Sequence, residues 1–320
     1  MAIDLSICIV NWNACNLLRQ CLTSIRQADA TGFSLETIVV DNASNDGSAD
    51  MVAGEFPEVT LVRNAANAGF ARGNNQAAAV SQGRYLFFLN NDTVVPPGSL
   101  DALLAFMRSH PEAGIVGPRL VGADGRPQCS YRGRLTFAAL LHRQPLFRVT
   151  RLFRKVYYRY RFWDFNPNVL CQVDSLMGAA VCLPRDVFFE IHGWDEQFQF
   201  GLEDVDLSDR VGERRPIVFF PGAEIMHVGG VSSRANSSFA YLGEECGYVR
   251  YLRKRGLHAW KIAVYKLLVV LNLPLALAVQ AYRAVSRRLR RGPAPAGRPH
   301  SQLAPLWYFS TRGLGRFLWS

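Results

Sequence analysis

The sequence predicts an α/β fold with a mostly parallel central sheet, and three observations support this prediction. Short apolar runs rich in Ile, Val and Phe recur through the first 110 residues. Segments with apolar residues at helical spacing separate these runs, so strand and helix signals alternate. Polar residues follow directly on the ends of several predicted strands. Alternating strands and helices imply βαβ units, whose crossovers are right-handed in nearly all known cases.

Each element of this first part has a local signal. The predicted strands are the apolar runs 5–10, 37–40, 60–62 and 85–89. The predicted helices cover 14–28, 48–56, 69–80 and 99–109. Helical spacing of Leu17, Leu18, Cys21, Leu22 and Ile25 supports the first helix. An Asn-Asp-Gly-Ser turn precedes the second helix, and a proline shortly precedes the last.

The second half of the chain is patterned less evenly. Residues 111–170 are irregular and contain a basic, aromatic stretch at 151–163. Later predicted elements are a strand near Val181, a helix from Arg185, a helix over 204–211 and a strand over 216–220. Residues 260–281 are strongly apolar but are interrupted by Lys266, Asn272 and Pro274. The tail after Arg283 is rich in Arg, Pro and Gly, which predicts partial disorder.

Composition limits the classes of protein. The chain has 320 residues, 49% of them hydrophobic, which is enough for a large buried core. Its formal net charge is +10, with Arg and Lys crowded into 143–161, 250–255 and 283–291. Such a balance suits nucleic acid, anionic lipid or a phosphorylated substrate. No base-reading motif or stacking stripe is visible, so we expect no nucleic-acid partner.

The cysteines and the N-terminus predict a cytosolic protein. There are seven cysteines, an odd number, and none forms a CxxC pair. We expect them to be reduced and mostly buried. The first residues, MAIDLSICIV, have no basic region and lead directly into a predicted strand. We therefore expect no secretory signal.

Polar side chains collect at one edge of the predicted sheet. Asn11 follows the first strand, Asp41 the second, and Asn90, Asn91 and Asp92 the fourth. Ligands of open parallel sheets bind outside the carboxyl ends of the strands. The sequence therefore predicts a ligand site that includes Asp41 and Asp92.

Each candidate residue also has an ordinary structural explanation. Asp92 suits a divalent cation on a diphosphate, but Asp residues also form turns and helix caps. The carboxylates at Glu203, Asp204 and Asp206 could supply a general base, or only complement the dipole of a helix N-terminus. His227 could bind a metal or be structural. Arg72 could bind phosphate or be an exposed helix cation.

The order of these motifs is more specific than any one of them. Residues 6–230 contain SICIVNWN, VVDNAS, NAGFARGNN, YLFFLNND, GWDEQFQFGLEDVDL and HVGG in that sequence. The chain resembles the inverting glycosyltransferases of the GT-A fold, family 2 type, and most closely their rhamnosyltransferase-like branch. The resemblance covers about 250 residues. It implies a GT-A catalytic domain over 1–250, with a nucleotide-binding half over 1–110 and an acceptor-binding half over 111–250.

The resemblance assigns roles to individual residues. Asp204 is implied as the catalytic base, with Glu203 beside it on the acceptor or orienting the base. Asp92 and His227 are implied as ligands of Mg²⁺ or Mn²⁺. Asn90 stands where the family often has Asp, which leaves Asp92 as the main carboxylate ligand. The residues implied on the nucleotide are Asn11, Asp41, Asn42, Arg72 and Asn91. Those implied on the acceptor side are Trp194 and Asp195.

The implied reaction is transfer of a sugar from a nucleotide-sugar to a saccharide or a lipid-linked saccharide. Rhamnose from dTDP-rhamnose is the first expectation, and a UDP-hexose or UDP-galactofuranose donor is the alternative. A catalytically silent sugar- or nucleotide-binding module is the competing class, but it would be expected to have lost Asp92, Asp204 and His227. The sequence does not identify the sugar or the acceptor.

The remaining residues, 251–320, are expected to form a basic helical extension. A segment lying in the membrane interface fits residues 260–282, with Arg283, Arg287, Arg288, Arg290 and Arg291 attracted to anionic lipid. The alternative is a helix buried against the catalytic domain. We expect a cytoplasmic enzyme held peripherally on the inner membrane.

Overall fold

The computed structural model describes residues 3–28, 32–161, 165–229, 237–289 and 303–320. The chain forms two compact units. Unit 1 comprises Met1–Arg134, Arg161–Gln199 and Glu203–Gly229, and unit 2 comprises Leu135–Tyr160, Phe200–Leu202 and Gly230–Ser320. Residues 135–160 thus group with the C-terminal helices, and the expected catalytic-domain boundary at residue 250 stays a prediction.

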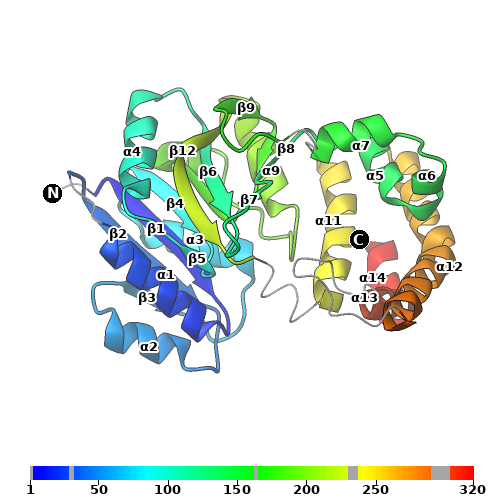
Figure 1. Cartoon of the computed structure of the whole chain (residues 1–320), viewed down its shortest axis with the longest axis horizontal. Coiled ribbons are helices and arrows are strands. Elements are labelled where there is room, and N and C mark those ends of the chain that lie inside the picture. Colours follow the sequence, from blue (N-terminus) through cyan, green and yellow to red (C-terminus); the bar gives the residue numbers. More distant parts are fainter. Residues whose placement is uncertain (1–2, 29–31, 162–164, 230–236, 290–302) are drawn as a thin grey trace. The chain divides into compact units, whose positions relative to one another are not determined.

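Unit 1 is a mixed sheet with helices on both faces (Figure 1). Its first elements are β1 (Leu5–Asn11), α1 (Cys15–Gln27), β2 (Leu35–Asp41), α2 (Ser48–Glu55), β3 (Thr60–Arg63), α3 (Phe70–Val80), β4 (Tyr85–Leu89), β5 (Thr93–Val94) and α4 (Ser99–Ser109). Next come β6 (Ile115–Val121), β7 (Pro127–Gln128), β8 (Tyr131–Arg132), β9 (Cys171–Val173), β10 (Ser175–Leu176), β11 (Ala180–Pro184), α8 (Arg185–Glu190), α9 (Glu203–Gly212) and β12 (Ile217–His227).

The main sheet has the strand order β3-β2-β1-β4-β11-β6-β12-β5. Strands β3, β2, β1 and β4 are parallel to one another, and β6 is parallel to β12. Strand β11 is antiparallel to both β4 and β6, so β4 and β6 share one direction. The prediction of a mostly parallel sheet is confirmed, and the carboxyl ends of β1, β2, β4 and β12 share one edge.

Alternating side chains of the strands supply two cores, one on each face of the sheet. Ile7 and Ile9 of β1 belong to a cluster with apolar residues of α1, α2 and α4. Cys8 belongs to the opposite cluster, with residues of α3, α8 and α9. Both faces of the central strands are therefore covered, which explains why YLFFL of β4 is apolar at every position and fully buried.

Unit 2 is helical. Its helices are α5 (Phe137–Arg143), α6 (Pro145–Val149), α7 (Arg154–Arg161), α11 (Ser237–Lys254), α12 (Ala259–Leu289), α13 (Leu303–Tyr308), a π-helical turn (Phe309–Gly313) and α14 (Leu314–Trp319). Helix α12 contains Pro274 and a 24-residue apolar stretch, Ala259–Tyr282, long enough to cross a membrane. The structure buries 33% of this stretch, and length and composition alone make it a weak candidate for a span.

The seven cysteines are all unpaired in the structure. Cys8, Cys21 and Cys182 are buried, whereas Cys129 is exposed. Burial raises the pKa of the Cys21 thiol to about 12, so this thiol is protonated at neutral pH and is a packing residue.

Candidate active site

The carboxyl edge of the sheet brings Asn11, Asp41 and Asn91 into one hydrogen-bond network. Asn11 and Asp41 are buried, and their positions are opposite one another in the register of β1 and β2. The Asn11 amide donates to Asp41 Oδ1 at 3.0 Å, and the Asn91 amide donates to Asn11 Oδ1 at 2.7 Å. The loop after β4 is therefore tied directly to the ends of β1 and β2.

Sequence reasoning missed two residues that shape this network. Ser44 donates its backbone N–H to Asp41 Oδ2 at 2.9 Å, and its hydroxyl accepts a bond from the Asn13 backbone N–H. Asn13 and Ala43 have φ values of 51° and 56°, in the left-handed region that residues other than Gly rarely occupy. Such backbone conformations are concentrated at functional sites. The sequence contains a turn signal a few residues later, at Asn-Asp-Gly-Ser, but it gives no indication of this strained backbone.

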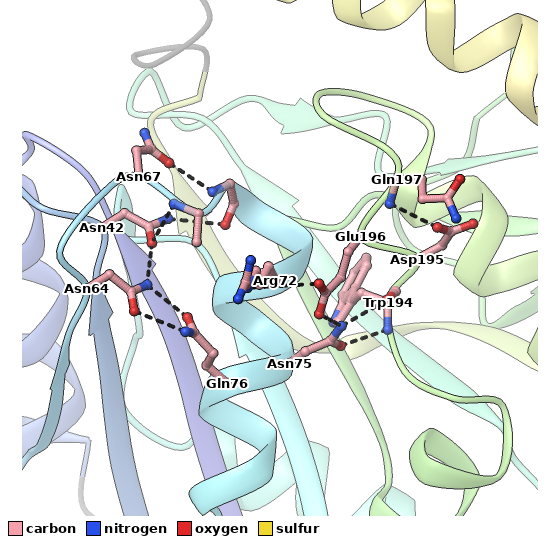
Figure 2. A network of polar contacts seen from close by, with 12 residues as sticks. Asn42, Asn64, Asn67, Arg72, Asn75, Gln76, Trp194, Asp195, Glu196 and Gln197 are labelled. Carbon is pink, nitrogen blue, oxygen red and sulfur yellow. Dashed lines mark hydrogen bonds and ion pairs between the residues drawn. The ribbon is translucent and has the colours of Figure 1, made fainter. Parts of the chain in front are cut away.

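Two residues predicted to bind the nucleotide, Asn42 and Arg72, lie near the start of α3 (Figure 2). Asn42 belongs to a network of side-chain amides. The Asn42 amide donates to the Gly69 carbonyl at 3.1 Å, and its Oδ1 accepts from Asn64 at 2.8 Å. Asn42 is buried and braces this loop. Arg72 has 61% of its side chain exposed and lies 4.0 Å from the Glu196 carboxylate, so its guanidinium remains accessible to an anion.

Trp194 does not lie on an open surface. Its side chain is 1% exposed and packs edge-on against Phe70 and Phe88. Asn75 binds both the N–H and the carbonyl of Trp194 at 2.9 Å (Figure 2). The indole therefore anchors the loop that carries Asp195, a half-buried residue whose Oδ1 accepts from the Gln197 N–H at 3.0 Å. Any role of Trp194 toward the acceptor is exerted through this loop.

Asp92 and His227, the two residues predicted to bind a metal, lie next to each other in the structure. His227 ends β12, and its position is opposite Thr93 in the pairing of β12 with β5. Asp92 Oδ1 lies 3.4 Å from His227 Nε2, and both side chains are 9% exposed. The Gly229 N–H donates to Asp92 Oδ2 at 3.1 Å, which fixes the carboxylate. The Asn90 amide nitrogen is also 3.4 Å from His227 Nε2.

This pair fits a hard divalent cation that keeps several external ligands. Two ligands of one octahedral ion with bonds of about 2.1 Å lie roughly 3 Å apart, close to the separation seen here. Within the described part of the chain, no group of three His, Cys, Asp or Glu residues could hold a metal. Mg²⁺ commonly binds through one or two protein groups plus substrate phosphates, so a partial protein site suits that use.

Asp204 is half-buried in the first turn of α9 and has a defined orientation. Its Oδ2 accepts from the Gly178 N–H at 3.2 Å, and its Oδ1 accepts from the Val205 N–H at 2.8 Å. Gly201 and Leu202 precede the helix with φ values of 77° and 72°. A left-handed Leu is unfavourable, so the sharp turn into α9 is locally strained.

A short backbone segment links Asp204 to the Asp92 loop. Gly178 donates to Asp204, and the neighbouring Ala179 carbonyl accepts from the Asn90 N–H at 2.9 Å. Ala180 then begins β11 opposite Leu89, the last residue of β4. The predicted base and the predicted metal pair therefore lie at the same edge of the sheet. Asp206, two residues on, is instead buried and paired with Arg210 at 2.9 Å.

Comparison with solved structures gives the class of fold. A mannosyltransferase from Pyrobaculum calidifontis, solved with GDP-Man and Mn²⁺, is similar with a TM-score of 0.55 and 18% identity, over 99% of this chain and 86% of that one. GalNAc-T7, solved with UDP, GalNAc and Mn²⁺, is similar with a TM-score of 0.54 and 16% identity, over 71% of this chain and 43% of that one. The fold is that of the GT-A glycosyltransferases.

Comparison with protein families is more specific. Residues 6–175, more than half of the chain, match the model of glycosyl transferase family 2, and the chain belongs to that family. An N-acetylglucosaminyl-diphospho-decaprenol L-rhamnosyltransferase of Mycobacterium tuberculosis is 28% identical over 221 residues, which are 62% of this chain and 68% of the relative. The chain is therefore a glycosyltransferase similar to the rhamnosyltransferase branch, as the sequence predicts.

Proposed function

We propose that this chain transfers one sugar from a nucleotide-sugar to an acceptor hydroxyl with inversion, using Asp204 as the general base. The main support for this proposal is the backbone segment 178–180. Its hydrogen bonds connect the Asp204 carboxylate to the loop that contains Asp92. The proposed proton acceptor and the proposed diphosphate-binding pair thus lie at one sheet edge. This proximity supports a single in-line displacement, in which the base and the leaving group act on one bound sugar.

The proposed step needs few protein groups. Asp204 accepts the proton of the acceptor hydroxyl while that oxygen forms a bond to the anomeric carbon. The bond from the anomeric carbon to the diphosphate breaks, and the nucleoside diphosphate leaves with the electron pair. Asp92 and His227 would hold a Mg²⁺ or Mn²⁺ ion, whose positive charge would offset that of the diphosphate. Arg72, with its accessible guanidinium, is suited to the same phosphates.

Rhamnose from dTDP-rhamnose is the proposed donor sugar. The support is the similarity to the M. tuberculosis rhamnosyltransferase, whose name also specifies a lipid-linked diphospho-sugar acceptor. A UDP-hexose or UDP-galactofuranose donor is the alternative. A thermal-shift panel of dTDP- and UDP-sugars, each with and without Mn²⁺, tests base, sugar and metal together. The proposal expects the largest Mn²⁺-dependent shift with dTDP-rhamnose, and no shift with any donor would contradict it.

Helix α12 supports a membrane-facing role for unit 2, because it exposes several large apolar side chains while its two polar interruptions are buried. Trp260, Leu267 and Leu271 are exposed by 62%, 56% and 64%, whereas Lys266 and Asn272 are buried. Lys266 donates to the carbonyls of Leu318 and Ser320 at 2.8 and 2.7 Å. The polar residues that interrupt this apolar segment therefore point into unit 2.

We propose that this apolar face lies in the interface of an anionic membrane. Trp260, Val264, Leu267, Leu271 and Leu275 recur every three or four residues, so they share one side of the helix. An apolar face bordered by basic segments is typical of interfacial helices. The proposed location is the cytoplasmic face of the inner membrane, where a lipid-linked acceptor would be reached. The arginines expected to assist lie outside the residues whose side chains are described.

A further inference from the structure

Gln128 binds His227 through both ends of its side-chain amide. It belongs to the two-residue strand β7, which pairs with β6 and places Gln128 opposite Leu120. The Gln128 Nε2 donates to the His227 carbonyl oxygen at 2.8 Å. The Gln128 Oε1 lies 3.0 Å from His227 Nδ1. One amide therefore holds both the backbone and the imidazole of the same residue.

The first of these bonds fixes the orientation of the amide. A backbone carbonyl only accepts hydrogen bonds, so the end of the Gln128 side chain that faces it must be the NH₂ group. The opposite end, which faces the His227 ring, must then be the carbonyl oxygen. An amide oxygen also only accepts, so His227 Nδ1 carries the hydrogen. In the neutral ring, Nε2 is consequently the nitrogen that keeps its lone pair, and the Asn90 amide nitrogen lies 3.4 Å from it.

Nε2 lies on the side of the ring next to Asp92, the other residue that would hold the metal. His227 Nε2 lies 3.4 Å from Asp92 Oδ1, and neither atom carries a proton when the ring is neutral and Asp92 is ionised. We infer that Gln128 is a positioning residue that selects the Nδ1–H tautomer of His227 and so presents Nε2 as a metal ligand. The inference rests on the proposed function for its metal, but the tautomer follows from the contacts of Gln128 alone. Hydrogen-bond partners of metal-bound histidines commonly have this effect.

Two substitutions separate the proposed effect from simple bracing of β7. Gln128→Leu is close in size but removes both the donor and the acceptor. Gln128→Glu keeps an acceptor for the Nδ1–H, but it adds a negative charge and replaces the donor to the His227 carbonyl by a second acceptor. If Gln128 merely supports the strand, both substitutions should weaken Mn²⁺ binding equally. If Gln128 sets the tautomer of His227, only Gln128→Leu should weaken Mn²⁺ binding.

The first readout uses the metal-free protein. Nitrogen chemical shifts of the His227 ring, measured at a pH where the ring is neutral, distinguish the Nδ1–H from the Nε2–H tautomer. We expect Nδ1–H in the wild type and in Gln128→Glu, and a shift toward Nε2–H in Gln128→Leu. Retention of the Nδ1–H form in Gln128→Leu, with an unchanged melting temperature, would overturn the inference.

The second readout is Mn²⁺ affinity in the presence of a nucleoside diphosphate, followed by electron paramagnetic resonance of the free ion. Gln128→Leu should bind Mn²⁺ about 10- to 100-fold more weakly, the usual effect of losing such a partner. Gln128→Glu should stay within a few-fold of the wild type. Equal affinity in all three proteins would overturn the effect of Gln128 on the metal. A wild type that binds no Mn²⁺, while the tautomer still responds to Gln128→Leu, would instead contradict the metal site of the proposed function.

Discussion

Asp92 Oδ1 and His227 Nε2 lie 3.4 Å apart although β4 and β12 are separated by more than a hundred residues. The parallel directions of these strands bring their carboxyl ends to one edge, and β5 pairs with the end of β12. Topology, rather than local sequence, thus brings together the loop after β4 and the end of β12, which carry the two residues of the proposed cation site.

Removal of either member of this pair should abolish the dependence of transfer on metal. In Asp92→Asn or His227→Ala, we expect transfer at saturating donor to fall by at least about 100-fold, because several kcal/mol of charge stabilisation would be lost. The measurement is the rate of sugar transfer as Mn²⁺ is titrated. Asp101→Asn, in the first turn of α4, is the matched control and should behave like the wild type. A variant of the pair with normal metal dependence would contradict the assignment.

Gly178 should be intolerant of a side chain. A Cβ atom at this position would lie 3.2 Å from the Cβ of Asp204, closer than ordinary contact, and would touch the buried Trp194 ring at 3.6 Å, so Asp204 would have to shift by a few tenths of an ångström. Displacement of a catalytic group by a fraction of an ångström to 1 Å costs about 10- to 100-fold in rate. Gly178→Ala should therefore lower kcat with little change in donor affinity.

The control for Gly178→Ala is Gly54→Ala in α2, where no atom lies within 4 Å of the added Cβ. Alanine in a helix interior is favoured over glycine by up to about 1 kcal/mol, so this variant should be at least as stable as the wild type and fully active. Equal kcat values for Gly178→Ala and Gly54→Ala would show that Asp204 is not positioned through Gly178.

The apolar face of α12 should be required for vesicle binding. Leu267→Glu and Leu271→Glu place charge on residues exposed by 56% and 64%, so the fold of unit 2 should be retained. We expect both variants to lose most of their flotation with vesicles that contain anionic lipid. Val80→Glu, at an exposed apolar residue of unit 1, should float like the wild type. Unchanged flotation of the α12 variants would exclude this face as the membrane contact.

Unit 2 contains a buried carboxyl that should make its stability depend on pH. Burial raises the pKa of Glu245, although Arg143, 3.2 Å away, acts in the opposite direction. The folded state therefore binds the Glu245 proton more tightly than the unfolded chain does. The stabilisation from this proton is complete below the ordinary Glu pKa of about 4.5, and it is lost as the pH rises through the pKa of Glu245 in the folded protein. Glu245→Gln should flatten this part of the curve of unfolding free energy against pH. If the unfolding free energy of Glu245→Gln had the same slope against pH as that of the wild type, the assigned role of Glu245 would be wrong.

The fold of unit 1 was largely predictable because local patterns determine it. The run 85–89 is apolar at every position, as a strand covered on both faces must be, and it forms β4. The alternation of strands and helices likewise predicted that the carboxyl ends of parallel strands place Asn11, Asp41 and Asp92 at one edge of the sheet. Strand β12 is longer than expected, extending to His227, because a bulge between Phe220 and Glu224 lets pairing with β6 continue past a Pro-Gly turn signal.

The parts of the site that could not be predicted depend on contacts distant in sequence. The motif around Trp194 predicts a residue on the acceptor side. Its packing against Phe70 and Phe88 could not be predicted, because only the folded chain brings these rings together. Gln128 and Gly178 belong to no motif, and their importance arises from what lies opposite them. The helices of 135–160 show no sequence signal for joining those after residue 230, because that association depends on packing rather than periodicity.

The most direct test of the central claim is Asp204→Asn, measured for donor binding and for transfer in the same preparation. The substitution keeps the size of the side chain and an oxygen for the Gly178 N–H. It replaces the oxygen that accepts from the Val205 N–H by an NH₂ group, and it removes the ability to accept a proton, which is worth on the order of 10²- to 10⁴-fold in rate. We expect wild-type affinity for the nucleotide-sugar with Mn²⁺ and a loss of transfer of that size. Transfer near the wild-type rate would contradict the assignment of Asp204 as the base.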